Sequence, residues 1–175
     1  KLTLVFIWGA VLLMGAVLRF TALEQRPMHT DEAVHAIKFQ YLLQDREYDY
    51  DPFEYHGPTL NVFTLVPCSL TGIQSIGSTT EWHLRIVPAF FGWLLILTPL
   101  MAVTLIGHRA AGLAGLFIAL SPAFVFYSRY YIQEMLLVVF VMAALLLYVL
   151  AVRDKRRFFI FISGLAWGLA AATKE

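Results

Sequence analysis

The stretch LTLVFIWGAVLLMGAVL (Leu2–Leu18) decides the fold, because it is a long apolar run without a single charged residue. A helix needs about 17–25 such residues to cross about 30 Å of hydrocarbon. The whole chain is 59% hydrophobic and 14% charged, whereas soluble domains are roughly 45–50% apolar and 25% charged. This composition predicts an integral membrane protein.

Five apolar runs predict five membrane-spanning helices. We expect these spans at 2–20, 85–106, 110–127, 134–152 and 158–173. The predicted fold is therefore an all-α, polytopic helical bundle whose long first outer loop, 21–84, carries interfacial helices. No small-residue cleavage pattern follows the first run, so we expect it to be retained. Because the chain ends directly after an apolar run, we expect it to be the N-terminal part of one longer transmembrane domain, inactive by itself.

Basic residues predict which loops lie in the cytoplasm. Arg109 lies between the second and third expected spans, and RDKRR (Arg153–Arg157) lies between the fourth and fifth. Short loops rich in Lys and Arg stay on the cytoplasmic side. We therefore expect a cytoplasmic N-terminus, with the loop 21–84 and Lys174 on the outer face.

The run Pro58–Ile73 offers an alternative, because a sixth span there would invert the orientation of everything after it. Pro67 interrupts this run, and a crossing would place the RDKRR loop outside. A helix that lies in the outer interface explains the same residues without that conflict.

The stretch HTDEAVHA (His29–Ala36) places two adjacent carboxylates just beyond the first span. Thr30 is a good N-cap, so Asp31 and Glu32 would occupy the first turn of a helix, where the helix dipole favours anions. Capping alone would explain one acid pair. However, further ionisable residues return to the same outer face: His35, His56, Arg129, Glu134 and Lys174. Ionisable groups at the ends of spans usually line a cavity or pathway.

The residue types on this face suit a phosphorylated lipid substrate. Acids from separate loops can bind a divalent cation or act as a general base. Arg129 and Lys174 suit a phosphate, although either could instead anchor a chain end at the lipid surface. An ion-coupled transporter is the competing class, but transport sites usually lie near the bilayer midplane.

The order of these motifs resembles the GT-C superfamily of polytopic membrane glycosyltransferases. The motifs are the DE pair, YHGP (Tyr55–Pro58), SP…YSR (Ser121–Arg129), the basic inner loop and TKE (Thr173–Glu175). That superfamily includes protein O-mannosyltransferases, lipid A aminoarabinose transferases and the catalytic subunit of oligosaccharyltransferase. The pattern is most similar to a prokaryotic branch, the flippase-activity-associated proteins of N-glycosylation loci. The resemblance implies a glycosyltransferase of a prokaryotic plasma or inner membrane, with its active site on the outer face.

The resemblance also implies roles for the acids. Asp31 would be the catalytic residue of the first outer loop, acting as base toward the acceptor or holding the acceptor and a metal, and Glu32 would be its partner. Asp31 and Glu134 would hold a divalent cation, Mg²⁺ or Mn²⁺. Relatives often carry a DxD pair where this chain has only Glu134 after YYIQ, and metal-independent members of the superfamily show that a cation is not required.

We expect four further residues to bind the substrate: His35, His56, Arg129 and Lys174. The donor that the resemblance implies is a polyprenyl-phosphate-linked sugar. The other expected partners are membrane lipid and a protein, glycan or lipid acceptor, and no nucleic acid. The alternative function is non-catalytic: the chain would bind the lipid-linked sugar or assist its translocation, as the name of the branch suggests.

Overall fold

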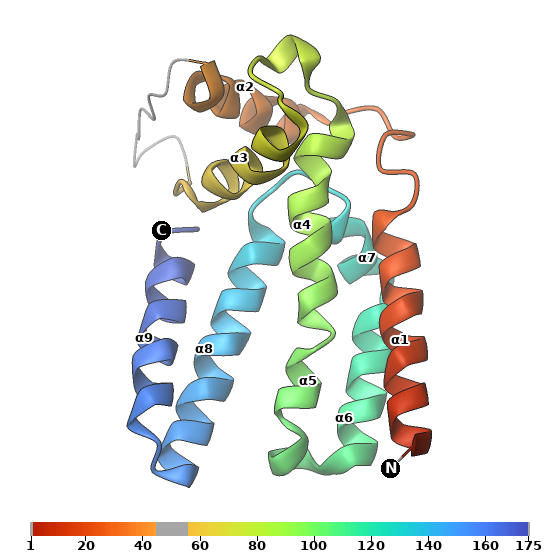
Figure 1. Cartoon of the computed structure of the whole chain (residues 1–175), viewed down its shortest axis with the longest axis vertical. Helices are drawn as coiled ribbons and strands as arrows, with labels where there is room; N and C mark the ends of the chain where they lie inside the picture. The colour runs from red at the N-terminus through yellow and green to blue at the C-terminus, as the bar shows by residue number, and fades with distance from the viewer. Residues whose placement is uncertain (1, 45–55, 175) are drawn as a thin grey trace.

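The computed structural model describes residues 2–44 and 56–174, and every regular element within them is helical. The longer helices of the bundle run along its long axis (Figure 1). They are α1 (Leu2–Phe20), α4 (Glu81–Leu95), α6 (Val103–Leu120), α8 (Glu134–Asp154) and α9 (Arg157–Ala171). Three segments, Glu81–Met101, Val103–Leu120 and Glu134–Asp154, are long and apolar enough to cross a membrane. The predicted all-α polytopic membrane fold is confirmed, while the crossings by α1 and α9 stay predictions.

Two of the expected spans are divided in the structure. The second run continues past α4 into the short α5 (Thr98–Met101). The third, expected at 110–127, is interrupted: α6 ends at Leu120 and α7 covers Pro122–Ser128. Proline lacks an N–H and pushes the residue before it into extended backbone. Ser121 accordingly has φ −56° and ψ 121°, so a new helix begins at Pro122.

Two further helices, α2 (Thr30–Gln44) and α3 (Thr59–Thr71), lie across one end of the bundle (Figure 1). The α3 helix therefore does not run along the bundle axis, in keeping with the interfacial helix expected at Pro58–Ile73. Its residues Val62, Val66 and Leu70 are exposed at a spacing of four, while Leu60 and Cys68 are buried. An exposed apolar stripe on a helix of this kind suits the lipid–water interface.

The two ends of the bundle differ in composition. The start of α6, which is kinked at Gly107, lies at the same end as the N-terminal end of α1, together with the turn between α8 and α9 (Figure 1). Gly107 has φ +80°, in the left-handed region that glycine adopts most easily. The C-terminus lies at the opposite end, with α2 and α3. The basic loops thus lie at one end and the acid pair at the other.

We expect the end that carries α2 and α3 to face the non-cytoplasmic side, because the basic loops favour the cytoplasm. Cysteine labelling in sealed cells checks this, in a Cys68→Ala background that removes the one native thiol. A membrane-impermeant maleimide should label the exposed Gln44→Cys variant and should label Lys155→Cys only after permeabilisation. The reverse pattern would show that the orientation is wrong.

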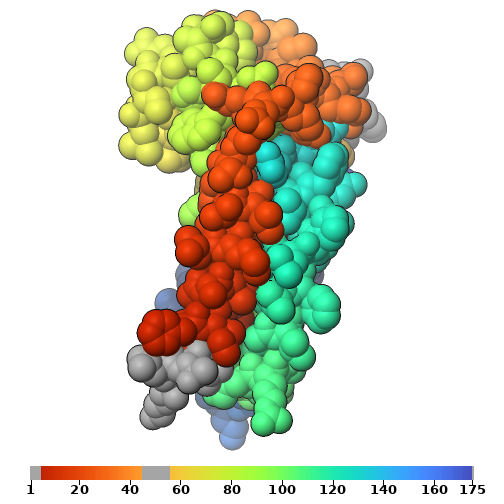
Figure 2. All heavy atoms as spheres, turned by 90° about the vertical axis from the view of Figure 1, so that its right-hand side faces the viewer, coloured from red at the N-terminus to blue at the C-terminus, as the bar shows by residue number. Residues whose placement is uncertain are grey.

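The buried side chain of Arg19 joins three helices at the end of α1. Figure 2 shows α1 lying along α6 and α7. Arg19 donates to the carbonyls of Ala119 at 3.0 Å and Ile118 at 2.9 Å, and to the Ser128 hydroxyl at 3.2 Å. The last carbonyls of a helix lack partners within it, and a cation there is favoured by the dipole. Arg19 therefore fixes where α1, α6 and α7 meet.

Candidate functional site

Glu32 forms a buried ion pair with Arg85 of α4. The Nε and Nη2 atoms of Arg85 donate to the two Glu32 oxygens at 2.8 and 2.9 Å. The relative exposure of the two side chains is 0% for Glu32 and 1% for Arg85. Arg85 also donates through Nη1 to the carbonyls of Leu23 and Arg26, at 2.7 and 2.8 Å. This two-pronged contact holds the start of α2, the segment before it and α4 in one arrangement.

Further donors complete the surroundings of the Glu32 carboxylate. Arg26 Nη2 donates at 2.9 Å, and the backbone N–H groups of His29 and Tyr131 donate at 3.0 and 2.9 Å. Burial raises the pKa of the Glu32 carboxyl. The hydrogen bonds from Arg85, His29 and Tyr131, together with the charge of Arg85, lower this pKa by more than burial raises it, so the net pKa lies below its usual value. Glu32 is therefore an ionised carboxylate enclosed by protein groups.

The helix begins one residue earlier than the sequence suggested. The first helical hydrogen bond runs from the Ala33 N–H to the His29 carbonyl, at 3.0 Å, so His29, not Thr30, occupies the N-cap position. Glu32 lies three residues further on and accepts the His29 N–H, which is the contact a capping box makes from its third residue. The expectation of Thr30 as N-cap was wrong, because the Glu32 carboxylate satisfies the helix start instead.

Asp31 lies on the other side of the same turn. Its side chain is 65% exposed, since successive residues of a helix point about 100° apart. One carboxylate oxygen, Oδ2, accepts a hydrogen bond from the Tyr130 hydroxyl at 3.1 Å. The two adjacent acids therefore differ completely in environment, and Asp31 is the one that an external molecule can reach.

Four of the predicted residues gather around the first turns of α2. The rings of His35 and His56 are stacked with centroids 6.5 Å apart, and Lys174 Nζ lies 3.3 Å from Glu134 Oε1. A glycine makes this meeting possible, because a Cβ on Gly57 would collide with the Ala172 carbonyl. The YHGP and TKE motifs are thus in direct contact. We call His35, His56, Glu134 and Lys174 the His35 cluster.

The charges of Asp31 and of the other members of the His35 cluster act on the His35 imidazole. Burial lowers the pKa of the His35 imidazole, as do the charges of His56 and Lys174, while Glu134 and Asp31 raise it; the net direction is downward. His35 is therefore a neutral imidazole near pH 7. Glu134 adds an acceptor, because its Oε2 atom is buried without a hydrogen-bond partner.

Arg129 does not join the His35 cluster. It lies toward the end of α1, where its guanidinium donates to the carbonyls of Ala22 at 3.0 Å and Leu18 at 3.4 Å. There it lines a cavity of about 350 Å³ together with Arg26 and with apolar side chains of α7. The Arg26 guanidinium packs over the ring of Phe126, with its central carbon 5.2 Å from the ring centroid. We call this space the arginine cavity.

The arginine cavity carries an excess of positive charge. Arg26, Arg85 and Arg129 line it, and Glu32 is the carboxylate with which Arg26 and Arg85 pair. Two guanidinium groups with one shared carboxylate, plus Arg129, leave a cationic surface beside apolar walls. Guanidinium groups bind phosphate oxygens in a planar, paired geometry. The cavity therefore suits a phosphate that is attached to an apolar group.

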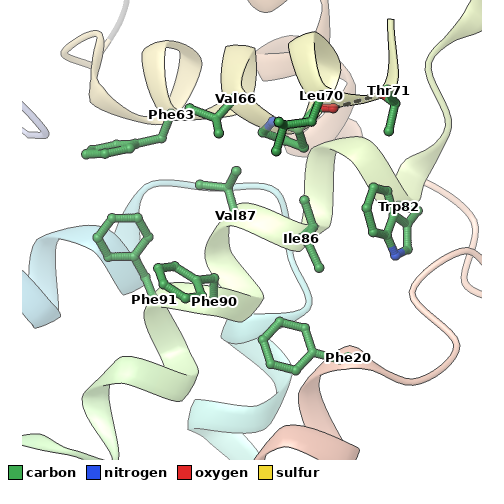
Figure 3. A pocket seen from close by; sticks show the side chains of 11 residues that line it. Phe20, Phe63, Val66, Leu70, Thr71, Trp82, Ile86, Val87, Phe90 and Phe91 are labelled. Carbon is green, nitrogen blue, oxygen red and sulfur yellow. Dashed lines mark hydrogen bonds between the residues drawn. The ribbon is translucent and has the colours of Figure 1, made fainter. Parts of the chain in front are cut away.

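An apolar groove lies between α3 and α4 on another face of the same end (Figure 3). Its volume is about 360 Å³, and Phe20 of α1 contributes to its wall. In Figure 3 the side chains of Val66 and Leu70 on α3 face Ile86 and Val87 on α4 across it. The groove contains none of the predicted site residues. It suits a hydrocarbon chain rather than the polar part of a substrate.

The predicted cation site rests on two carboxylates, those of Asp31 and Glu134. Within residues 2–44 and 56–174, no three His, Cys, Asp or Glu side chains gather as metal ligands do. The charges of Asp31 and Glu134 both act on His35, and Mg²⁺ is commonly bound by one or two carboxylates, with water and substrate phosphate as its other ligands. A cation held by Asp31 and Glu134 stays a prediction.

Three contributors to the site were not predicted as functional: Arg26, Arg85 and Tyr130. Arg85 offered a signal, because an arginine within the first turns of an apolar run is costly unless it is paired. Tyr130 offered none, since an aromatic residue between two spans is ordinary. Their roles follow from contacts between segments far apart in the sequence.

Part of the chain matches a known protein family. The family described as dolichyl-phosphate-mannose-protein mannosyltransferase matches residues 65–175. That range includes Arg85, Arg129, Tyr130, Glu134 and Lys174, while Asp31 precedes it. No curated protein and no solved structure matches the chain.

Proposed function

Because the chain belongs to the dolichyl-phosphate-mannose-protein mannosyltransferase family, we propose that it transfers a sugar from a polyprenyl-phosphate-linked donor to an acceptor on the non-cytoplasmic face. The observation that carries the proposal is the place of Asp31. This exposed carboxylate lies at the end of the bundle that carries α2 and α3. The Tyr130 side chain contacts both Asp31 and Arg26 of the arginine cavity. The charge of Asp31 also acts on His35.

In the proposed reaction, Asp31 accepts the proton of an acceptor hydroxyl as that oxygen attacks the anomeric carbon. The bond between this carbon and the phosphate oxygen breaks, and its electron pair leaves with the polyprenyl phosphate. The arginine cavity would stabilise the negative charge that develops on this leaving group. Direct displacement of this kind inverts the anomeric centre.

The other predicted residues have different roles in the proposed reaction. Glu32 does not touch the substrate but positions Asp31, since its oxygens are bonded to Arg85, Arg26 and backbone groups. Lys174 pairs with Glu134, so we assign the donor phosphate to Arg129 and Arg26 rather than to Lys174. The neutral His35 and the free Glu134 oxygen would accept or donate hydrogen bonds to sugar or acceptor hydroxyls. The apolar groove would hold the hydrocarbon chain of a lipid.

The Arg129→Gln variant should weaken donor binding, because it removes a guanidinium from the arginine cavity but keeps an amide that can bond the α1 carbonyls. Loss of a hydrogen bond to a charged group predicts a rise of about 10-fold or more in the KM for donor. Arg109→Gln, at the opposite end of the bundle, is the matched control and should leave KM unchanged. Equal KM values for both variants would show that the donor phosphate does not bind in the arginine cavity.

The proposed function is tested with the full-length protein in membranes and radiolabelled dolichyl-phosphate mannose as the probe. We expect label to move from the lipid fraction into protein, glycan or another acceptor. Preparations without the protein control for hydrolysis. If the donor binds and all label stays on the lipid, transfer is excluded for this donor, and the binding or translocation function becomes the better account. The flippase-associated branch predicts that second outcome.

A further inference from the structure

The ring of Tyr130 is fixed on several sides. The residue is 6% exposed. The guanidinium carbon of Arg26 lies 4.9 Å from its ring centroid, and the Phe126 ring is stacked with it at a centroid distance of 5.5 Å. The His29 ring meets it edge-on, at 5.6 Å. Aromatic stacking and cation–π contacts of this kind restrict a side chain to one orientation.

The Tyr130 hydroxyl points toward Asp31, the exposed one of the two adjacent acids. It lies 3.1 Å from Asp31 Oδ2 and 2.6 Å from His29 Nδ1. A phenol has one proton, so donation to Asp31 requires that His29 Nδ1 carries a hydrogen and donates to the phenol oxygen. In this tautomer Nδ1 does not accept the Asp31 backbone N–H, which lies 3.4 Å away. Burial, together with the hydrogen bond to Asp31, raises the pKa of Tyr130 to about 12. The hydroxyl therefore keeps its proton at physiological pH.

Asp31 needs such an anchor more than a buried carboxylate would. With 65% of its side chain exposed, it would otherwise sample several rotamers, and a general base works only when it is held in reach of the proton it removes. Glu32 cannot supply this restraint to the Asp31 side chain, because it is directed into the ion pair with Arg85.

We propose that Tyr130 is a positioning residue, which holds Oδ2 of the Asp31 carboxylate so that the other oxygen, Oδ1, meets the acceptor hydroxyl. This inference rests on the proposed function, in which Asp31 is the base. It assigns to Tyr130 an effect on turnover through Asp31, with no contact to the donor phosphate. Removal of the hydroxyl should therefore change kcat and leave donor binding intact.

The test is Tyr130→Phe in the full-length protein, with radiolabelled dolichyl-phosphate mannose as donor. This variant keeps the ring and its stacking and removes only the hydroxyl. We expect kcat to fall by about 10–100-fold, with the donor KM and Tm close to those of the wild type. Tyr127→Phe is the matched control, because Tyr127 lies only three residues earlier, near the end of α7, and is exposed. It should leave kcat unchanged.

A double-mutant cycle with Asp31→Asn separates positioning from a structural role. If Tyr130 acts through Asp31, Tyr130→Phe should cost almost nothing further in the Asp31→Asn background. An equal cost in both backgrounds overturns the inference, as does a loss of kcat that only follows a loss of folded protein. If Asp31→Asn abolishes transfer while Tyr130→Phe is normal, the inference fails and the proposed function stands. Normal transfer by the Asp31→Asn variant would instead show that Asp31 is not the general base.

Discussion

Asp31→Asn should lower turnover by about 10²–10⁴-fold, the contribution that a positioned general base makes, while the donor still binds. Asparagine keeps the size of the side chain and can still contact the Tyr130 hydroxyl, but it cannot accept the proton of the acceptor. The measurement is the rate of label transfer alongside the affinity for radiolabelled dolichyl-phosphate mannose, both in the full-length protein. Because Asp31 is largely exposed, little change in Tm is expected.

Glu81→Gln is the matched control for this prediction. Glu81 is also an acid in the first turn of a helix at the same end of the bundle, so this variant tests whether any lost carboxylate there reduces transfer. It should transfer normally. A loss of donor binding in Asp31→Asn that matches its loss of transfer would mean that Asp31 binds the lipid and does not act as the base.

Arg85→Met should destabilise the protein strongly. It leaves the buried Glu32 carboxylate without its main partner, and removal of one member of a buried ion pair typically costs about 3–5 kcal/mol. A large fall in Tm of the detergent-solubilised protein should follow, with loss of transfer because the start of α2 is no longer held. Arg153→Met removes an exposed arginine that pairs with its neighbour Asp154 and donates to the Thr104 carbonyl at 2.8 Å, and it should lower Tm far less.

Two further measurements check that the pair, and not the arginine alone, is responsible. In the double variant Glu32→Gln with Arg85→Met, no charge remains to be buried, so Tm should partly recover. The pKa of Glu32 is lowered in the folded state, so its contribution is present above the unfolded-state pKa and is lost as the pH falls through the lower folded-state pKa. If Arg85→Met and Arg153→Met show equal Tm values, the ion pair does not hold this end of the bundle.

The helical bundle could be predicted because the required information is local. The length of an apolar run sets whether a helix can span a membrane, and the bounds of α1, α8 and α9 lie within a few residues of the expected spans. The interruption between α6 and α7 was missed, although Pro122 carries the signal for it. Hydropathy alone does not register a proline between two apolar runs.

The site was predictable only in part, since its geometry depends on contacts across the fold. The sequence indicated that His35, His56, Glu134 and Lys174 return to one end, and the structure brings them together. It could not indicate that Arg129 points instead toward α1. Nor could it show that Glu32 is enclosed by Arg85, because fifty-three positions separate the two residues. Only packing reveals which of two adjacent acids is exposed.

The most direct test of the central claim, that Asp31 performs chemistry on a lipid-linked sugar, compares wild type and Asp31→Asn in sealed proteoliposomes with radiolabelled dolichyl-phosphate mannose. Two quantities are followed together: the label that leaves the lipid and the label that crosses between leaflets. The account predicts that wild-type protein releases label from the lipid, and that Asp31→Asn binds the same amount of donor but releases far less. Label that crosses the bilayer while still attached to its lipid, equally in both proteins, would contradict it.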